Sequence, residues 1–103
     1  MKADLNSILI EGKLSENVAL DSAGVAIVSI THRRVRKATT EPGNIVRENW
    51  PFQVRVAGKV AERIDGIKAG RVIRVVGRLA IARGQTVVDA EHVEIAPGGF
   101  PYA

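Results

Sequence analysis

Apolar and polar residues alternate along most of the chain, and this period of two is typical of β-strands rather than helices. Five stretches show the pattern and predict strands at residues 7–14, 25–36, 50–57, 71–82 and 86–95. In the second stretch, for example, Ala26, Val28 and Ile30 are expected to share one face. The alternation therefore predicts a mainly β protein.

The fourth and fifth predicted strands carry signs of curvature. The fourth is predicted to place Ile73, Val75, Leu79 and Ile81 on the core-side face together with Gly77, which marks a bend or a close approach. In the fifth, the apolar positions step by three residues from Ala90 to Val93. That step predicts a β-bulge near Glu91 and His92.

Turn-forming residues separate the strands. Residues 37–48 contain Pro42-Gly43-Asn44 and are predicted to form a long flexible loop, whereas residues 82–85 predict a short hairpin connection. Pro51 has no N–H to donate to a ladder, so we expect it at the start of its strand or on a sheet edge.

One segment has helical periodicity. Val60, Ile64 and Ile67 lie at i, i+4 and i+7 within residues 59–67, and Gly66 and Gly70 end the segment. The resulting order β-β-β-α-β-β indicates an OB fold, a five-stranded Greek-key barrel with a short helix between strands three and four. Another small β-barrel or an open α+β sheet is the alternative.

The composition allows one domain with an aliphatic core. The chain has 103 residues, of which 46% are hydrophobic, but only four are aromatic (Trp50, Phe52, Phe100 and Tyr102). We expect residues 1–96 to form the OB domain and the Gly/Pro-rich residues 97–103 a flexible tail. The absence of cysteine excludes disulfides and zinc–thiolate sites. With no apolar run of about 20 residues and no signal-peptide pattern, we expect a cytoplasmic protein.

Charge is distributed very unevenly along the chain. Residues 33–83 hold thirteen of the fifteen Lys and Arg residues and only four acids, a formal charge of +9, whereas residues 1–32 carry −2 and residues 84–103 carry −3. A basic segment of this strength most often serves a phosphate backbone. Nucleic acid is therefore the leading candidate partner.

The densest basic run is Arg33, Arg34, Arg36 and Lys37, at the end of the second predicted strand. No acid interrupts it, so we interpret it as a phosphate clamp. The alternative is a solvated charged loop, which is the usual outcome for a run of like charges.

A second candidate group lies on the strands. Arg55, Arg74 and Arg78 are predicted on faces opposite the core, where they would form a basic stripe across the barrel, and Arg83 lies in the adjoining hairpin connection. The alternative for the stripe is charge that protects strand edges from aggregation.

Trp50 is the strongest candidate for stacking on a base, a contact worth roughly 1–3 kcal/mol. Its parity matches Phe52, Val54 and Val56, so a core position at the end of the barrel is the alternative.

The sequence contains no recognisable catalytic group. His32 and His92 lack partners at ligand spacing, so we expect no metal and no cofactor. Asp89, Glu91 and Glu94 have no nucleophile motif nearby and are interpreted as a solvated face. We expect a binding protein rather than an enzyme.

Four segments resemble the bacterial single-stranded DNA-binding (SSB) protein family: residues 5–14 (LNSILIEGKL), 54–62 (VRVAGKVAE), 68–79 (KAGRVIRVVGRL) and 90–95 (AEHVEI). They follow the family's order over roughly residues 5–96. The family stacks bases on aromatic residues of strands two and three, where this chain has Val35-Arg36, Pro51 and Ala57. The family's finger between strands four and five is reduced here to Arg83-Gly84-Gln85, and its acidic C-terminal tail is missing.

The short length and abbreviated finger are also similar to primosomal replication protein N (PriB), a relative of that family, as are Thr31-His32-Arg33 and residues 90–94. The resemblance implies single-stranded DNA binding in replication, recombination or repair. It also implies a homodimer or homotetramer that forms through the first strand, and replication proteins as partners. A PriB-like accessory whose basic face docks both protein and DNA is the main alternative, and an RNA-binding OB domain is a third.

Overall fold

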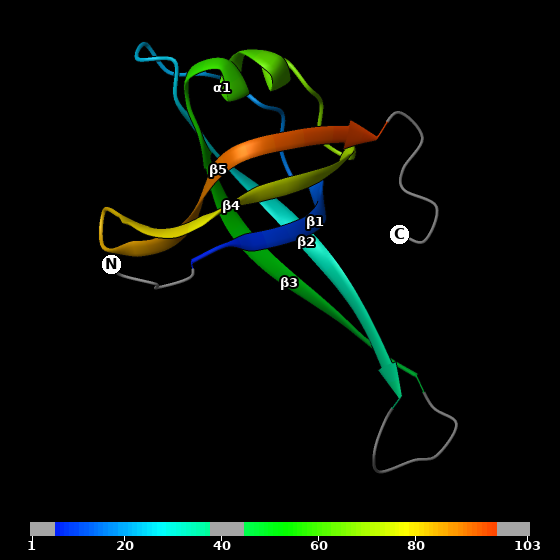
Figure 1. The fold of residues 1–103 in the computed structure, drawn as a ribbon. Helices are drawn as coiled ribbons and strands as arrows, with labels where there is room; N and C mark the ends of the chain where they lie inside the picture. The colour runs from blue at the N-terminus through cyan, green and yellow to red at the C-terminus, as the bar shows by residue number, and fades with distance from the viewer. Residues whose placement is uncertain (1–5, 38–44, 97–103) are drawn as a thin grey trace.

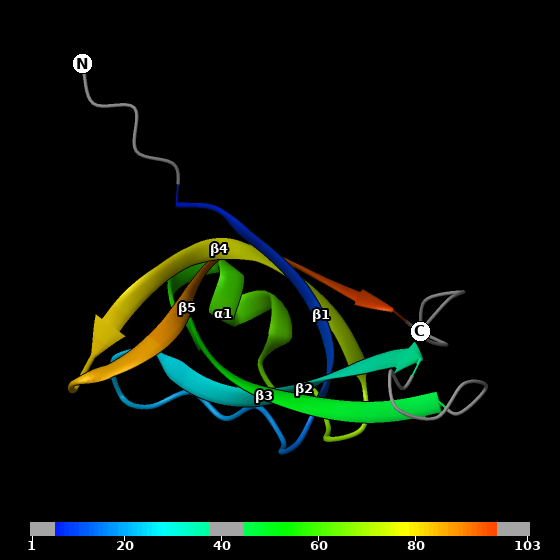
Figure 2. The same cartoon turned by 90° about the horizontal axis from the view of Figure 1, so that it is seen from below.

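The computed structural model describes residues 6–37 and 45–96. Five strands close into a barrel in the order β1-β2-β3-β5-β4, and one helix follows β3 (Figures 1 and 2). The strands are β1 (Ile8–Leu14), β2 (Ala26–Lys37), β3 (Ile45–Val56), β4 (Val72–Ala82) and β5 (Gln85–Ala96), and the helix is α1 (Gly58–Ile64). The OB fold predicted from the alternation is confirmed.

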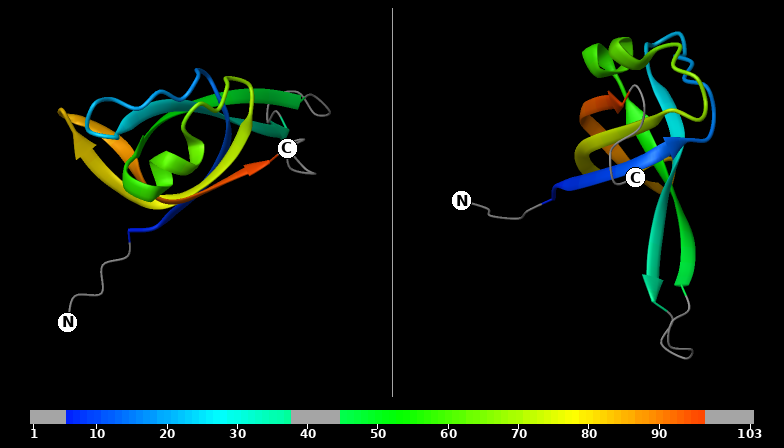
Figure 3. Two further views of the ribbon diagram at one scale, coloured as in Figure 1. Left: turned by 90° about the horizontal axis from the view of Figure 1, so that it is seen from above. Right: turned by 90° about the vertical axis from the view of Figure 1, so that its right-hand side faces the viewer.

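The core is aliphatic, as the composition predicts. Inward-facing residues of every strand are buried, and the largest fully buried side chains are Leu14, Val28, Ile30, Val54, Val56, Ile64, Ile73, Val75 and Val88. Helix α1 contributes Ala61 and Ile64 and lies over one end of the barrel (Figure 3). The helix ends at Ile64, three residues before the predicted end, because Gly66 adopts a left-handed φ of 81° and the Ile67 N–H donates to Ile64 O at 3.1 Å.

Gly77 and the bulge beside it act together. The β4–β5 register shifts between Val76, which faces His92, and Gly77, which faces Ala90, so Glu91 is the extra residue. A Cβ at position 77 would lie 2.3 Å from the Asp89 carbonyl oxygen, closer than real side-chain carbons approach. The predicted bulge is confirmed, and Gly77 permits the close approach.

The prediction of a loop over residues 37–48 was wrong at both ends. β2 continues through Lys37 and β3 begins at Ile45, and these two residues face each other in the register. The β-branched pair Ile45-Val46 favours a strand, and pairing with β2 outweighs the turn signal beside it. Pro42-Gly43-Asn44 lie outside the described residues, as do residues 97–103.

Pro51 lies inside β3 rather than at its start. It faces Thr31 of β2, whereas β3 pairs with β5 only at Val54 and Arg55. Pro51 is thus on a stretch of strand with one paired edge, which satisfies the edge expectation.

Two strand pairs extend beyond the closed barrel. In the β4–β5 hairpin, Leu79 is 48% and Ile81 69% exposed, so the prediction that both face the core was wrong. Leu79 and Ile81 lie on the same face of β4 as the buried Ile73 and Val75. The pairing of β4 with β1 ends at Gly77, so the strand extends beyond the barrel at Leu79 and Ile81. The second extension is formed by residues 32–37 of β2 and 45–50 of β3, and we call it the arm.

The arm separates from the barrel where β1 and β2 diverge. β1 pairs with β2 only at Lys13↔Thr31 and Leu14↔Ile30, whereas β2 and β3 stay paired from Ala26↔Val56 to Lys37↔Ile45. In Figures 1 and 3 the arm projects away from α1 and from the tip of the β4–β5 hairpin.

Candidate nucleic-acid interface

The arm carries all four residues of the predicted phosphate clamp. Its residues include five cations, Arg33, Arg34, Arg36, Lys37 and Arg47, and one acid, Glu48, a formal charge of +4. The clamp therefore lies on a two-stranded ribbon. Arg33 is exposed, whereas the side chains of residues 34–47 lie outside the described part.

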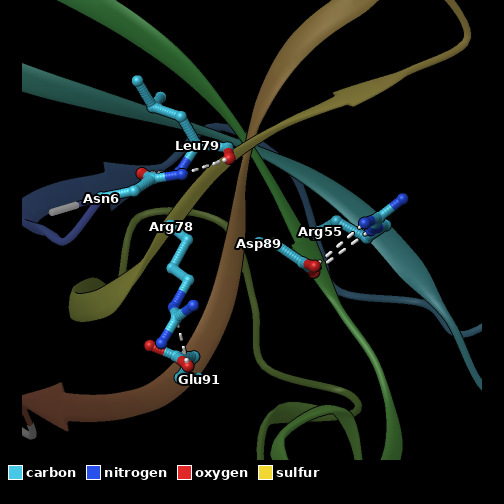
Figure 4. Close-up of polar contacts among 6 residues, drawn as sticks. All are labelled: Asn6, Arg55, Arg78, Leu79, Asp89 and Glu91. Carbon is cyan, nitrogen blue, oxygen red and sulfur yellow. Dashed lines mark hydrogen bonds and ion pairs between the residues drawn. The ribbon is translucent and has the colours of Figure 1, made fainter. Parts of the chain in front are cut away.

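Arg55 is held by Asp89 on the outer face of the barrel. Its Nε and Nη2 donate to Oδ1 and Oδ2 of Asp89 at 3.2 and 2.9 Å, a bidentate pair (Figure 4). The hydrogen bond from the guanidinium holds the pKa of Asp89 below its usual value, and the same contact raises the pKa of Arg55.

The other two arginines of the predicted stripe are also paired. Arg74 Nη2 lies 2.9 Å from Glu11 Oε2 and its Nη1 lies 3.9 Å from Glu94 Oε2. Arg78 Nε lies 3.4 Å from Glu91 Oε2 (Figure 4). The acids interpreted from sequence as a solvated face are thus partners of these arginines.

Arg83 lies apart from both groups. It is exposed in the turn between β4 and β5 and has a left-handed φ of 52°. Figure 1 places this hairpin tip far from the arm, so the structure does not bring Arg83 together with the clamp.

Trp50 lies at the root of the arm and is 39% exposed, so it is not a buried core residue. Its Nε1 donates to Glu48 Oε2 at 3.0 Å, and its ring lies 6.4 Å from that of His32 between centroids, tilted by 55°. The two residues face each other in the β2–β3 register. The arm thus presents a partly exposed indole on the same ribbon that carries the predicted clamp.

A cleft of about 770 Å³ lies between β1 and the root of the arm. Its lining includes Trp50, His32, Lys13, Asn49 and Leu9. His32 Nδ1 lies 2.8 Å from the Glu11 carbonyl oxygen, so the imidazole extends the contact between β1 and β2 beyond their last backbone pair.

Sequence reasoning missed Lys13, His32 and Asn49 as neighbours of Trp50. Lys13 lies outside the basic segment of the sequence. It faces Thr31 in the β1–β2 register and lines the same cleft as Arg33. The Thr31-His32-Arg33 segment carries the one signal in the sequence, its similarity to PriB proteins.

The described residues contain no group of three or more His, Cys, Asp or Glu residues that could hold a metal ion. Within the same residues, no helix is long and apolar enough to cross a membrane.

Solved structures share this architecture. A mutant of the single-stranded DNA-binding protein from Thermus aquaticus superposes with a TM-score of 0.71 at 22% identity, over 91% of this chain and 51% of that one. The Plasmodium falciparum SSB in complex with single-stranded DNA gives 0.69 at 15% identity, over 92% and 96% of the two chains. The fold is that of the SSB proteins.

PriB from Ralstonia solanacearum has the same architecture, with a TM-score of 0.61 at 24% identity over 90% of this chain and all of that one. The resemblance read from the sequence to SSB and PriB proteins is thus confirmed by shared fold. The chain spans about half the length of the Thermus aquaticus SSB. No protein-family model and no curated protein sequence matches the chain.

Proposed function

We propose that this protein binds single-stranded DNA without catalysing a reaction, and that the arm is its main contact surface. The observation that carries the proposal is the +4 charge of a ribbon that stands off the barrel, on the fold of SSB proteins. Each phosphate that a cation contacts releases counterions, so the affinity will fall with salt at a slope of about −0.7 per contact.

Trp50 supplies the preference for single strands in this proposal. A duplex hides the faces of its bases, whereas an unpaired base can stack on an indole that is 39% exposed. Arg33, Arg34, Arg36 and Lys37 would hold the phosphates on either side of that base. Arg55, Arg74, Arg78 and Arg83 are proposed as further contacts, and the first three must exchange a carboxylate for a phosphate.

The proposed setting is DNA replication, recombination or repair in the cytoplasm. A PriB-like accessory role, with replication proteins as additional partners, is the second candidate. It is favoured by the match to PriB from Ralstonia solanacearum, which this chain covers over its full length.

A homodimer or homotetramer through β1 is part of the proposal. Leu9 is 69% exposed, and within the described residues β1 pairs with β2 only at Lys13 and Leu14. A second copy on this edge would cover Leu9 and place two arms in one particle, which raises avidity. Sedimentation equilibrium at binding concentrations tests this point, and the mass of a single chain would refute it.

Fluorescence anisotropy with labelled single-stranded and duplex oligonucleotides of equal length, at several salt concentrations, tests the function. We expect tighter binding to the single strand, with a salt slope corresponding to several contacts. Equal and weak binding to both, lost near physiological salt, would refute the proposal and indicate a generic basic surface.

A further inference from the structure

The outer face of the barrel alternates arginines and carboxylates over four strands. We call this set the barrel charge network, and its members are Glu11, Arg55, Arg74, Arg78, Asp89, Glu91 and Glu94. With three cations and four acids its formal charge is −1. The set by itself therefore presents no net positive charge to a polyanion, although three of its side chains are guanidinium groups.

The strand registers bring two of the arginines to either side of one acid. Asp89 of β5 faces Arg55 of β3 across one edge and Arg78 of β4 across the other. Its carboxylate takes both hydrogen bonds from Arg55, at 3.2 and 2.9 Å. Arg78 is instead paired with Glu91, the extra residue of the bulge (Figure 4).

These contacts have the chemistry of phosphate recognition. A guanidinium binds a carboxylate or a phosphate through the same fork of parallel N–H donors, so a carboxylate oxygen pair occupies the place that a phosphodiester would take. The pairs are also open to solvent, since the Arg55 and Asp89 side chains are 32% and 46% exposed and those of Arg78 and Glu91 are 66% and 55% exposed. A phosphate can therefore reach both guanidinium groups from solvent and compete with the carboxylates that hold them.

We propose that Arg55 and Arg78 form a second phosphate site on the barrel, and that Asp89 and Glu91 mask it in the free protein. The inference rests on the proposed function, because the anion it would take is the backbone of a bound single strand. Phosphates held first on the arm would compete with the two carboxylates for the guanidinium groups. The carboxylates thereby restrict binding to strands long enough to reach from the arm to the barrel.

The test is a double-mutant cycle on the full chain with a labelled oligothymidylate long enough to reach beyond the arm. Asp89→Asn releases Arg55 while keeping the size of the side chain, so we expect about fivefold tighter binding and a salt slope steeper by about 0.7. In the Arg55→Gln background the same Asp89→Asn change should leave the affinity unchanged, because no guanidinium remains to be released.

Glu62→Gln is the matched control. Glu62 is an exposed acid on α1, so its substitution removes one negative charge without touching the network. A gain for Asp89→Asn no larger than that for Glu62→Gln, or a gain that persists without Arg55, would overturn the masking proposal. If the wild-type protein binds single-stranded and duplex DNA equally well, the proposed function itself is overturned. Thermal unfolding of each variant confirms that affinities refer to folded protein.

Discussion

The arm and the outer face of the barrel both carry arginines, but their formal charges differ in sign: +4 for the arm and −1 for the barrel charge network. On the barrel, Arg55, Arg74 and Arg78 each lie beside at least one carboxylate, whereas the arm combines five cations with one acid. The acids on the barrel come from the two ends of the chain. β4 belongs to the basic middle of the chain and lies between β1 and β5, which belong to its acidic ends. The fold therefore places acidic residues of β1 and β5 next to arginines of β4.

The difference shows that a basic segment of the sequence does not by itself form a basic surface, because the fold can place acids from distant segments beside it. The arm keeps a formal charge of +4, and it projects beyond β1 and β5, the strands that bring Glu11 and Asp89 to the barrel. Function is therefore expected where the chain leaves the barrel, and four experiments can break or sharpen this contrast.

Neutralising the arm should have the largest effect. Replacing Arg33, Arg34, Arg36 and Lys37 by Gln should lower single-strand affinity on the order of 100-fold and reduce the salt slope by about 3, since four phosphate contacts are removed. The measurement is fluorescence anisotropy over a salt series.

The control for the arm variant neutralises exposed cations at the other end of the molecule, Lys59, Arg63 and Lys68. Their loss should cost much less affinity for each charge removed. Equal losses per charge would show that only the net charge matters and would end the distinction between arm and barrel.

Gly77→Ala should damage the barrel and leave the arm intact. The added Cβ would lie 2.3 Å from the Asp89 carbonyl oxygen, and overpacking of this kind costs about 1–3 kcal/mol. Urea denaturation measures the loss in free energy of unfolding. Gly24→Ala is the control. At position 24 a Cβ would meet nothing within 4 Å but φ is 76°, so this variant measures the cost of backbone strain without a clash.

Trp50→Ala should weaken binding about tenfold if a base stacks on the indole. The variant should lose less stability than a substitution of a fully buried core residue, because the Trp50 side chain is 39% exposed. Trp50→Phe keeps an aromatic face and should retain most of the affinity. Trp50 is the single tryptophan of the chain, so quenching of its emission by DNA reports the contact directly. If the Trp50→Ala variant unfolds more readily but its folded fraction binds DNA with unchanged affinity, Trp50 is not part of the interface.

The smallest effect concerns the Arg55–Asp89 pair and pH. Because Arg55 lowers the pKa of Asp89, the pair stabilises the folded state above the ordinary carboxyl pKa of about 3.9, and this contribution is lost as the pH falls through the lower folded-state value. The stability difference between wild type and Asp89→Asn should therefore be present at neutral pH and disappear in acid. Thermal unfolding between neutral and acidic pH measures it, and a difference independent of pH would contradict the pairing.

Local patterns were sufficient for most of the fold. Alternation located all five strands, the three-residue step from Ala90 to Val93 located the bulge, and the stripe through Ile64 located the helix. These features depend on neighbours within a few residues. The predictions that failed depend on distant partners, because Leu79 and Ile81 keep the parity of a core strand after β4 has left the barrel.

The candidate site divides in the same way. The sequence by itself determined an OB barrel, the basic run at Arg33–Lys37 and a lone tryptophan, because composition, periodicity and charge order are properties of the chain. Only the tertiary structure decided which arginines of the barrel are paired with acids, because pairing depends on strand order and register. It set Asp89 between Arg55 and Arg78, brought Lys13 and Arg33 to the lining of one cleft, and left Trp50 exposed at the root of the arm.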